Sequence, residues 1–140
     1  MFDRVIAMPV LAASDLTRAR AFWHDVLGRD PVLTDVGGDI YDVGGVAVHV
    51  YESAYAGTAK STTLGLITDD LNRDMAALRE RGVEFHEYDL PGVKTVDGVM
   101  EMDGERAAWF SDSEGNIIAI EEPSPERLEQ VQRMRAAIAG

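Results

Sequence analysis

Cysteine is absent from this sequence of 140 residues. Its absence excludes disulfide bonds, thiolate nucleophiles, iron–sulfur clusters and zinc sites built from cysteine. Basic residues are also scarce, because 13 Lys and Arg stand against 25 Asp and Glu and leave a formal net charge of −12. Such a charge repels polyanions, so we expect neither nucleic acid nor an anionic membrane surface as a partner.

Long apolar runs are missing as well. No uninterrupted apolar stretch approaches the roughly 18 residues that predict a membrane-spanning helix. The first residues include Asp3 and Arg4 ahead of a short apolar run, and they lack the basic start and clean apolar core of a signal peptide. We therefore expect a cytoplasmic protein. With 46% hydrophobic and 27% charged residues, the composition is typical of one ordinary globular domain.

The hydrophobic pattern predicts elements whose order repeats along the chain. Expected strands cover residues 2–13, 31–35, 39–43, 46–51, 61–68, 83–88, 96–102, 106–111 and 116–121. Expected helices begin at Asp15, Asp70 and Pro125, and the first two end at Gly28 and Gly82. Because the two Asp-Leu starts and the two glycines are offset by nearly the same number of residues, we predict an internal repeat.

The repeat predicts an α+β fold made of two βαβββ modules. We place the modules at about residues 2–52 and 61–122, inside a single domain over 1–123. A C-terminal helix over 124–140 follows, with an apolar stripe made of Leu128, Val131, Met134 and Ile138. The segment 88–98 contains a Pro-Gly turn and is open to two interpretations, a lid or a simple hairpin.

Three segments resemble a known superfamily. They are SDLTRARAFWHDVLG (14–28), DDLNRDMAALRERGVEF (69–85) and FSDSEGNIIAI (110–120). They are similar to the two module helices and the final hairpin of the vicinal oxygen chelate superfamily, which includes glyoxalase I, bleomycin-resistance proteins, fosfomycin-resistance enzymes and extradiol dioxygenases. The resemblance implies curled mixed sheets with helices outside, a ligand cup inside and a homodimer.

The metal enzymes of that superfamily take ligands from four places. By resemblance these places fall on Met8 of the opening strand, His49, Thr63 and Ala119. Methionine, threonine and alanine do not supply the imidazole or carboxylate ligands that hard and borderline cations prefer. One histidine alone does not hold a catalytic metal ion. The sequence therefore predicts that the metal site and any cofactor are absent.

Strand alternation predicts which side chains face the cup. Val46, Val48 and Val50 should pack under the helix, which turns His49 and Tyr51 toward the cup. Small cup-facing residues leave volume for a bulky ligand, and aromatic ones suit a flat ligand. The candidate ligand-binding residues are Met8, His49, Tyr51, Thr63, Trp109, Ala119 and Glu121.

Three functions stay open on the sequence. The first is metal-free binding of a hydrophobic, aromatic small molecule in a dimeric cup, with protection by sequestration as in bleomycin resistance. The second is an enzyme acting on a small organic substrate with His49 or Glu121 as general acid or base. The third is a lyase, isomerase or dioxygenase with displaced metal ligands. His24 and His86 are interpreted as surface residues, His86 at a solvated strand edge.

Overall fold

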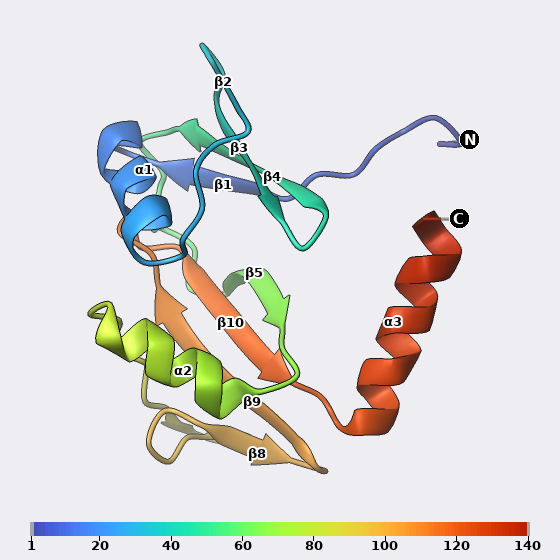
Figure 1. Ribbon diagram of the computed structural model, residues 1–140. Coiled ribbons are helices and arrows are strands. Elements are labelled where there is room, and N and C mark those ends of the chain that lie inside the picture. The colour runs from blue at the N-terminus through green and yellow to red at the C-terminus, as the bar shows by residue number, and fades with distance from the viewer. Residues whose placement is uncertain (1, 140) are drawn as a thin grey trace. The chain divides into compact units, whose positions relative to one another are not determined.

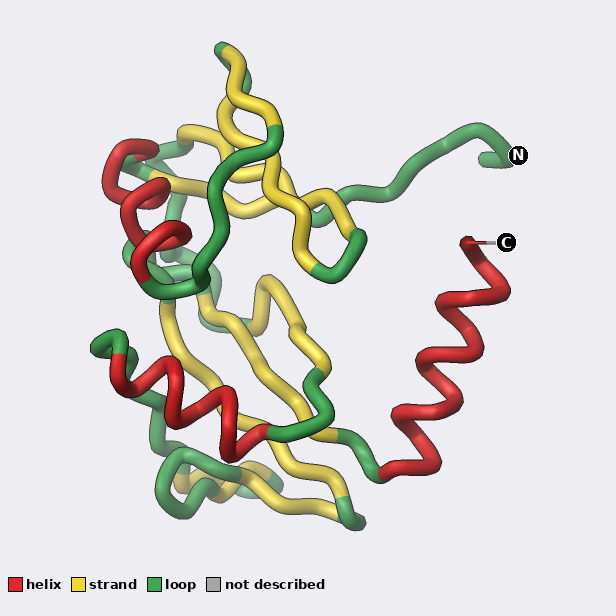
Figure 2. Tube along the Cα trace, viewed as in Figure 1, coloured by secondary structure: helices red, strands yellow, loops and turns green. Residues whose placement is uncertain are grey.

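The computed structural model describes residues 2–139 and shows the predicted mixture of helices and strands (Figures 1 and 2). The elements are β1 (Val10–Ala13), α1 (Leu16–Asp25), β2 (Leu33–Asp35), β3 (Gly38–Val43), β4 (Val46–Glu52), β5 (Thr62–Ile67), α2 (Leu71–Glu80), β6 (Asp89–Leu90), β7 (Val93–Lys94), β8 (Met100–Met102), β9 (Glu105–Ser111), β10 (Ile117–Glu122) and α3 (Pro125–Ala139).

The chain forms two compact units. The first unit is the chain up to Leu64 together with Ser111–Ile117, and the second is Gly65–Phe110 together with the chain from Ile118 onward. The first unit therefore contains a short segment that comes from late in the sequence.

Each half of the chain builds a four-stranded sheet with the same strand order. The orders are β1-β4-β3-β2 and β5-β10-β9-β8. In the first sheet β1 runs parallel to β4, while β3 is antiparallel to both β4 and β2. Because β8, β9 and β10 take the places of β2, β3 and β4, the predicted α+β fold with its repeated βαβββ pattern is confirmed. The segment 88–98 contains the short β6–β7 hairpin.

The two helices begin as the sequence predicts. The Asp15 carboxylate accepts a hydrogen bond from the backbone N–H of Arg18, and the Asp70 carboxylate accepts one from Arg73, both at 3.0 Å. A side chain that accepts from the first helical turn satisfies a donor with no partner in the helix itself. None of the helices within residues 2–139 is long and apolar enough to cross a bilayer.

A buried glutamate of the late segment holds the start of α1. Glu114 accepts hydrogen bonds from Arg18 at 2.7 and 3.0 Å, from the Asp15 backbone N–H at 2.9 Å and from the Ser14 hydroxyl at 3.2 Å. The Arg18 hydrogen bond is the main cause that lowers the pKa of Glu114 to about 2. This arrangement keeps the carboxylate charged at neutral pH although protein covers it.

Each unit has its own apolar core. In the first unit Trp23 of α1 stacks on Tyr41 of β3 with ring centroids 4.2 Å apart, and both side chains are fully buried. The remaining buried members of that core are Leu11, Ala13, Ala19, Val48 and Val50. In the second unit the buried members are Leu71, Met75, Ala108 and Ile120.

Two predicted strands, 2–13 and 96–102, are wrong in part, and the predicted strand 83–88 is wrong over its whole length. Residues 2–9 are not a strand, and regular pairing begins only at β1, just after Pro9, which has no backbone N–H to donate. Residues 83–88 are irregular, although the His86 backbone N–H donates to the Trp109 carbonyl at 2.8 Å. Residues 96–99 form a tight turn in which Val96 and Val99 exchange two hydrogen bonds, so only β8 remains of the predicted strand 96–102.

Two details of apolar packing also differ from expectation. Val46 is exposed because it is the first residue of β4, next to the Gly44-Gly45 turn. On α3 the predicted stripe is half-buried at Leu128 and Val131, whereas Met134 and Ile138 are exposed.

Candidate functional site

In the first unit, β4 separates packed side chains from those on the face opposite α1. Val48 and Val50 are buried in the core with Trp23, so the alternation places His49 and Tyr51 on the other face. We call this surface the first open face. Tyr51 is 39% exposed and His49 is partly exposed, so both side chains lie on the face opposite the core, while their place in a ligand cup stays a prediction.

The imidazole of His49 is held in place by the backbone. Its Nε2 lies 2.9 Å from the Gly37 carbonyl oxygen. Because a carbonyl only accepts hydrogen bonds, Nε2 must carry the proton, and Nδ1 is the acceptor of the neutral ring. The His49 and Tyr51 rings lie 6.1 Å apart in a tilted arrangement. The first open face thus offers two adjacent aromatic rings with an acceptor nitrogen.

In the second unit, β9 places Trp109 on the face opposite α2. Ala108 and Phe110, the residues on either side of it, are fully buried, and Ala108 belongs to the α2 core. Trp109 therefore points to the opposite side of the sheet. We call this surface the second open face.

Two aromatic residues lie against Trp109 on this face. The Tyr88 ring meets the Trp109 ring edge to face at 5.6 Å, and the His86 ring meets Tyr88 at 5.8 Å. The His86 Nδ1 and the Tyr88 hydroxyl are 2.7 Å apart, within hydrogen-bond distance. We call His86, Tyr88 and Trp109 the aromatic cluster. Edge-to-face pairs of this kind make a rigid apolar wall that retains polar edges.

The sequence interpretation missed two members of this cluster. It placed His86 on a solvated strand edge, but the side chain is half-buried because residues 83–88 run irregularly along β9 instead of forming a strand. Tyr88 is not among the candidate ligand-binding residues predicted from the sequence. The His-x-Tyr spacing was the available indication, since residues two apart in an extended segment project to the same side.

The other predicted site residues are dispersed. Met8 lies just before β1 instead of on the opening strand, because regular pairing begins after Pro9. The Thr63 hydroxyl donates to the Ile117 carbonyl at 3.0 Å, which ties β5 to β10. Ala119 is only 3% exposed, so neighbouring groups cover its methyl group, while Glu121 is exposed.

By the resemblance described above, the metal-ligand places are predicted to include Met8, Thr63 and Ala119. Met8, Thr63 and Ala119 present a thioether, a hydroxyl already donated to a carbonyl, and a methyl group. These groups do not fit a hard or borderline divalent cation. Across residues 2–139, no three side chains of the His, Asp and Glu types lie close enough together to hold a metal ion.

Comparison with known proteins identifies the fold. No protein-family model and no curated protein matches the sequence. Among solved structures, a glyoxalase/bleomycin resistance protein/dioxygenase from Alicyclobacillus acidocaldarius is similar with a TM-score of 0.69 and 15% identity, over 89% of this chain and 95% of that one. The fold is that of the glyoxalase and bleomycin-resistance proteins.

Two further neighbours belong to the same structural group. An antibiotic binding protein from a Streptomyces species is 27% identical with a TM-score of 0.56, over 86% of this chain and 98% of that one. A fosfomycin resistance protein from Listeria monocytogenes is 12% identical with a TM-score of 0.65, over 87% and 95% of the two chains. The vicinal oxygen chelate fold predicted from three sequence segments is thus confirmed.

Proposed function

We propose that this protein binds a hydrophobic, aromatic small molecule without a metal ion and protects by sequestering it. The observation that carries the proposal is the aromatic cluster, because its rings pack edge to face and form an apolar wall on the face of β9 opposite α2. His49 and Tyr51 supply a second aromatic pair on the first open face. An aromatic ligand gains both apolar burial and ring stacking against such walls.

The comparisons support a binder of this kind. The Streptomyces neighbour is named as an antibiotic binding protein, and it is more similar in sequence than the other two neighbours described above. The poor ligands at Met8, Thr63 and Ala119 favour a function that needs no metal ion. In this proposal a second copy of the chain completes the cup.

An enzyme is the second candidate, and the neighbours supply its support. Fosfomycin resistance protein from Listeria monocytogenes also matches in a complex with Mn(II) and a dihydroxypropylphosphonic acid. In this chain His49 would act as general acid or base, because its ring is oriented by the Gly37 carbonyl.

Calorimetric titration with 1-naphthol tests the binding proposal, with cyclohexanol as the non-aromatic control. Trp109→Leu and Tyr88→Leu should each weaken naphthol binding roughly 3–10-fold, the effect of losing one aromatic contact. Tyr55→Leu is the matched control, since Tyr55 is 80% exposed and lies outside the aromatic cluster. Equal affinity in all three variants would contradict the proposal.

Two measurements separate the binder from the enzyme. Elemental analysis of protein expressed with ample metal should find no stoichiometric divalent ion, and one tightly bound ion per chain would favour the enzyme. His49→Ala should reduce naphthol affinity modestly in a binder. In an enzyme that uses His49 as acid or base, it should lower turnover by about 10²–10⁴-fold while binding persists.

A further inference from the structure

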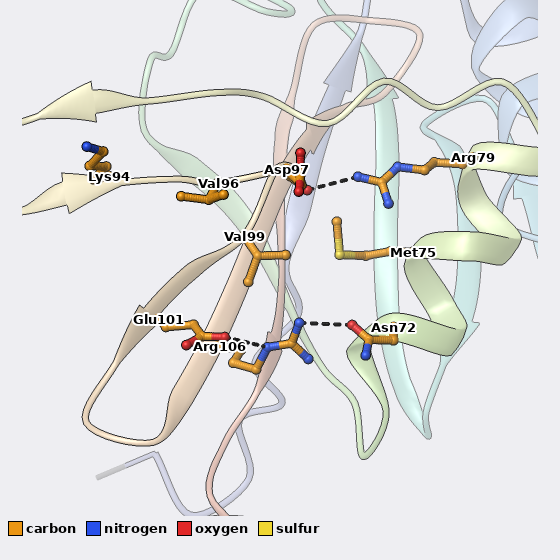
Figure 3. A pocket seen from close by; sticks show the side chains of 9 residues that line it. All are labelled: Asn72, Met75, Arg79, Lys94, Val96, Asp97, Val99, Glu101 and Arg106. Carbon is orange, nitrogen blue, oxygen red and sulfur yellow. Dashed lines mark hydrogen bonds and ion pairs between the residues drawn. The ribbon is translucent and has the colours of Figure 1, made fainter.

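A pocket of about 750 Å³ lies in the second unit on the α2 side of its sheet, the opposite face from Trp109 (Figure 3). Its apolar lining comes from Met75, Val96 and Val99. Three cationic side chains also line it: Arg79 from α2, Lys94 from β7 and Arg106 from β9. Two acidic residues, Asp97 and Glu101, also line the pocket, so its three basic and two acidic side chains leave a net charge of +1.

The guanidinium of Arg106 forms ion pairs with Glu101 and Glu122 but donates a hydrogen bond to neither carboxylate. Its Nε is buried 3.4 Å from a Glu101 carboxylate oxygen without making a hydrogen bond, and its Nη1 is 3.9 Å from Glu122. Its one close hydrogen bond is donated by Nη2 to the neutral Asn72 side-chain oxygen at 2.9 Å. By contrast, the paired arginine of α1, Arg18, donates to a carboxylate at 2.7 Å. Arg106 therefore retains unused capacity for a carboxylate.

Arg79 is positioned but not paired with an acid. Its guanidinium lies over the Phe85 ring at 5.1 Å and donates to the Asp97 backbone carbonyl at 3.0 Å. Within residues 2–139 it makes no ion pair with a carboxylate. Figure 3 shows Arg79 and Arg106 at opposite ends of the pocket, with Met75 and Val99 between them.

The wall of the pocket is preformed by a tight turn. Asp97 and Gly98 have φ angles of 52° and 80°, as the two central residues of a type I′ turn require. A Cβ at Gly98 would lie 2.9 Å from the Cβ of Phe85, and 3.4 and 3.5 Å from side-chain atoms of Met75 and Arg79 of α2, so glycine allows the turn to approach these residues closely. This close approach places the Asp97 carbonyl where Arg79 can bind it.

We propose that this pocket is a second binding site, selective for a small organic carboxylate with an apolar body. The carboxylate would pair with Arg106 or Arg79, and the apolar body would lie over Met75 and Val99. A carboxylate satisfies a guanidinium through two parallel hydrogen bonds, which a neutral amide cannot do. The site lies on the other face of the sheet from the aromatic cluster and does not depend on the proposed function.

Titration of ¹⁵N-labelled protein with cyclohexanecarboxylate tests the site by NMR. This probe has no aromatic ring, so the aromatic cluster gives it no stacking. Cyclohexanecarboxamide and inorganic phosphate are the two comparison ligands. We expect saturable shifts of amide signals from residues 72–79 and 96–106, with the carboxylate binding at least about tenfold more tightly than the amide.

Replacing basic and acidic residues of the pocket should change the affinity for the carboxylate in opposite directions. Arg106→Gln should weaken carboxylate binding about tenfold or more, and Arg79→Gln should weaken it several-fold. Glu101→Gln removes a competing carboxylate from an exposed position and should tighten binding. Arg127→Gln on α3 is the control and should leave affinity unchanged.

Three results would overturn the proposal. They are the absence of saturable shifts, equal affinity for the carboxylate and its amide, and phosphate binding as tight as carboxylate binding, which would make the apolar body irrelevant. If Arg106→Gln fails to fold, the other two variants still test the proposal. Arg79→Gln should weaken carboxylate binding and Glu101→Gln should tighten it.

Discussion

α1 and α2 each begin after a capping aspartate and carry an arginine three residues later. Arg18 of α1 reaches Glu114 in the late segment of the first unit. Arg73 of α2 instead pairs locally, with Asp69 at 2.9 Å and Asp74 at 3.0 Å. A distant glutamate is present in the second unit too, but Glu122 accepts a hydrogen bond from the backbone N–H of Leu71 at 2.8 Å and pairs with Arg106 of β9, not with Arg73.

The difference shows that a repeated helix start does not determine how the helix is anchored. In α1 a buried carboxylate joins the helix to a segment almost a hundred residues later in the chain. In α2 the arginine and its acidic neighbours form an exposed surface network, and such pairs contribute about 0–1 kcal/mol. The first helix therefore depends on tertiary structure more than the second does.

Replacing each of the two distant glutamates by alanine should show the largest difference between the two helix anchors. Glu114→Ala takes away a buried acceptor of hydrogen bonds from Arg18, Asp15 and Ser14, and should lower the free energy of unfolding by about 3 kcal/mol. Glu122→Ala loses one helix-start hydrogen bond and should cost about 1 kcal/mol. Urea denaturation of both variants measures the difference. Equal losses would mean that the anchors are equivalent.

Two glycines, one beside the late segment and one after α2, allow a second comparison of the two units. A Cβ at Gly57 would lie 2.5 Å from the Glu114 carbonyl oxygen, whereas a Cβ at Gly82 meets nothing within 4 Å. Both glycines have positive φ angles, 72° and 90°, so alanine is strained at each. Gly57→Ala should therefore destabilise the protein by about 2 kcal/mol more than Gly82→Ala, measured by thermal unfolding. Similar melting temperatures would show that the late segment can shift freely.

Acid pH should affect the Glu114 anchor in a defined window. The folded-state pKa of Glu114 is about 2, below the ordinary glutamate value of 4.5, mainly because Arg18 donates hydrogen bonds to it. Below 4.5 the unfolded chain binds more protons at this group, so its stabilising contribution is lost as the pH falls toward 2. The loss should be on the order of 1–2 kcal/mol, reduced because Arg18 is half-exposed.

Matched variants isolate this pH effect from the other carboxyl groups. Glu114→Gln should flatten the stability curve between pH 4.5 and 2, and Glu122→Gln should leave its slope in place. Burial raises the pKa of Asp112, which gives a slope of opposite sign, so only the difference between wild type and variant is informative. If the slope of stability against pH is unchanged in Glu114→Gln, Glu114 is not the group that causes it.

The sequence predicted the fold better than the candidate site, for identifiable physical reasons. The capping aspartates and the alternation of Val48, His49 and Val50 in β4 are local patterns, and both agree with the structure because local hydrogen bonds and one packed face determine them. The aromatic cluster depends instead on an irregular segment that lies beside β9. Alternation suggested a strand at residues 83–88, and only the tertiary contact of His86 with Trp109 shows where the segment lies.

The ion-pair partners of the two helix-start arginines also could not be predicted fully from the sequence. Arg18 and Arg73 occupy equivalent positions in the repeat, and Asp69 and Asp74 lie near Arg73 where Ser14 and Ala19 lie near Arg18. The sequence therefore indicates local partners for Arg73, but it does not indicate that Arg18 reaches Glu114. The distinction requires Glu114 to be brought from a distant turn, in which Asp112 accepts hydrogen bonds from the backbone of Glu114 and Asn116. Contacts of such long sequence separation are not visible in periodicity.

The late segment of the first unit also has a consequence for the order of synthesis. Ser111–Ile117 belongs to that unit, so a ribosome that has completed β1–β4 has not yet supplied Glu114. The start of α1 must therefore wait for its carboxylate partner while most of the second unit is translated. Since domains generally fold as they emerge, this N-terminal unit is exceptional in reaching its final state only when the chain is nearly complete.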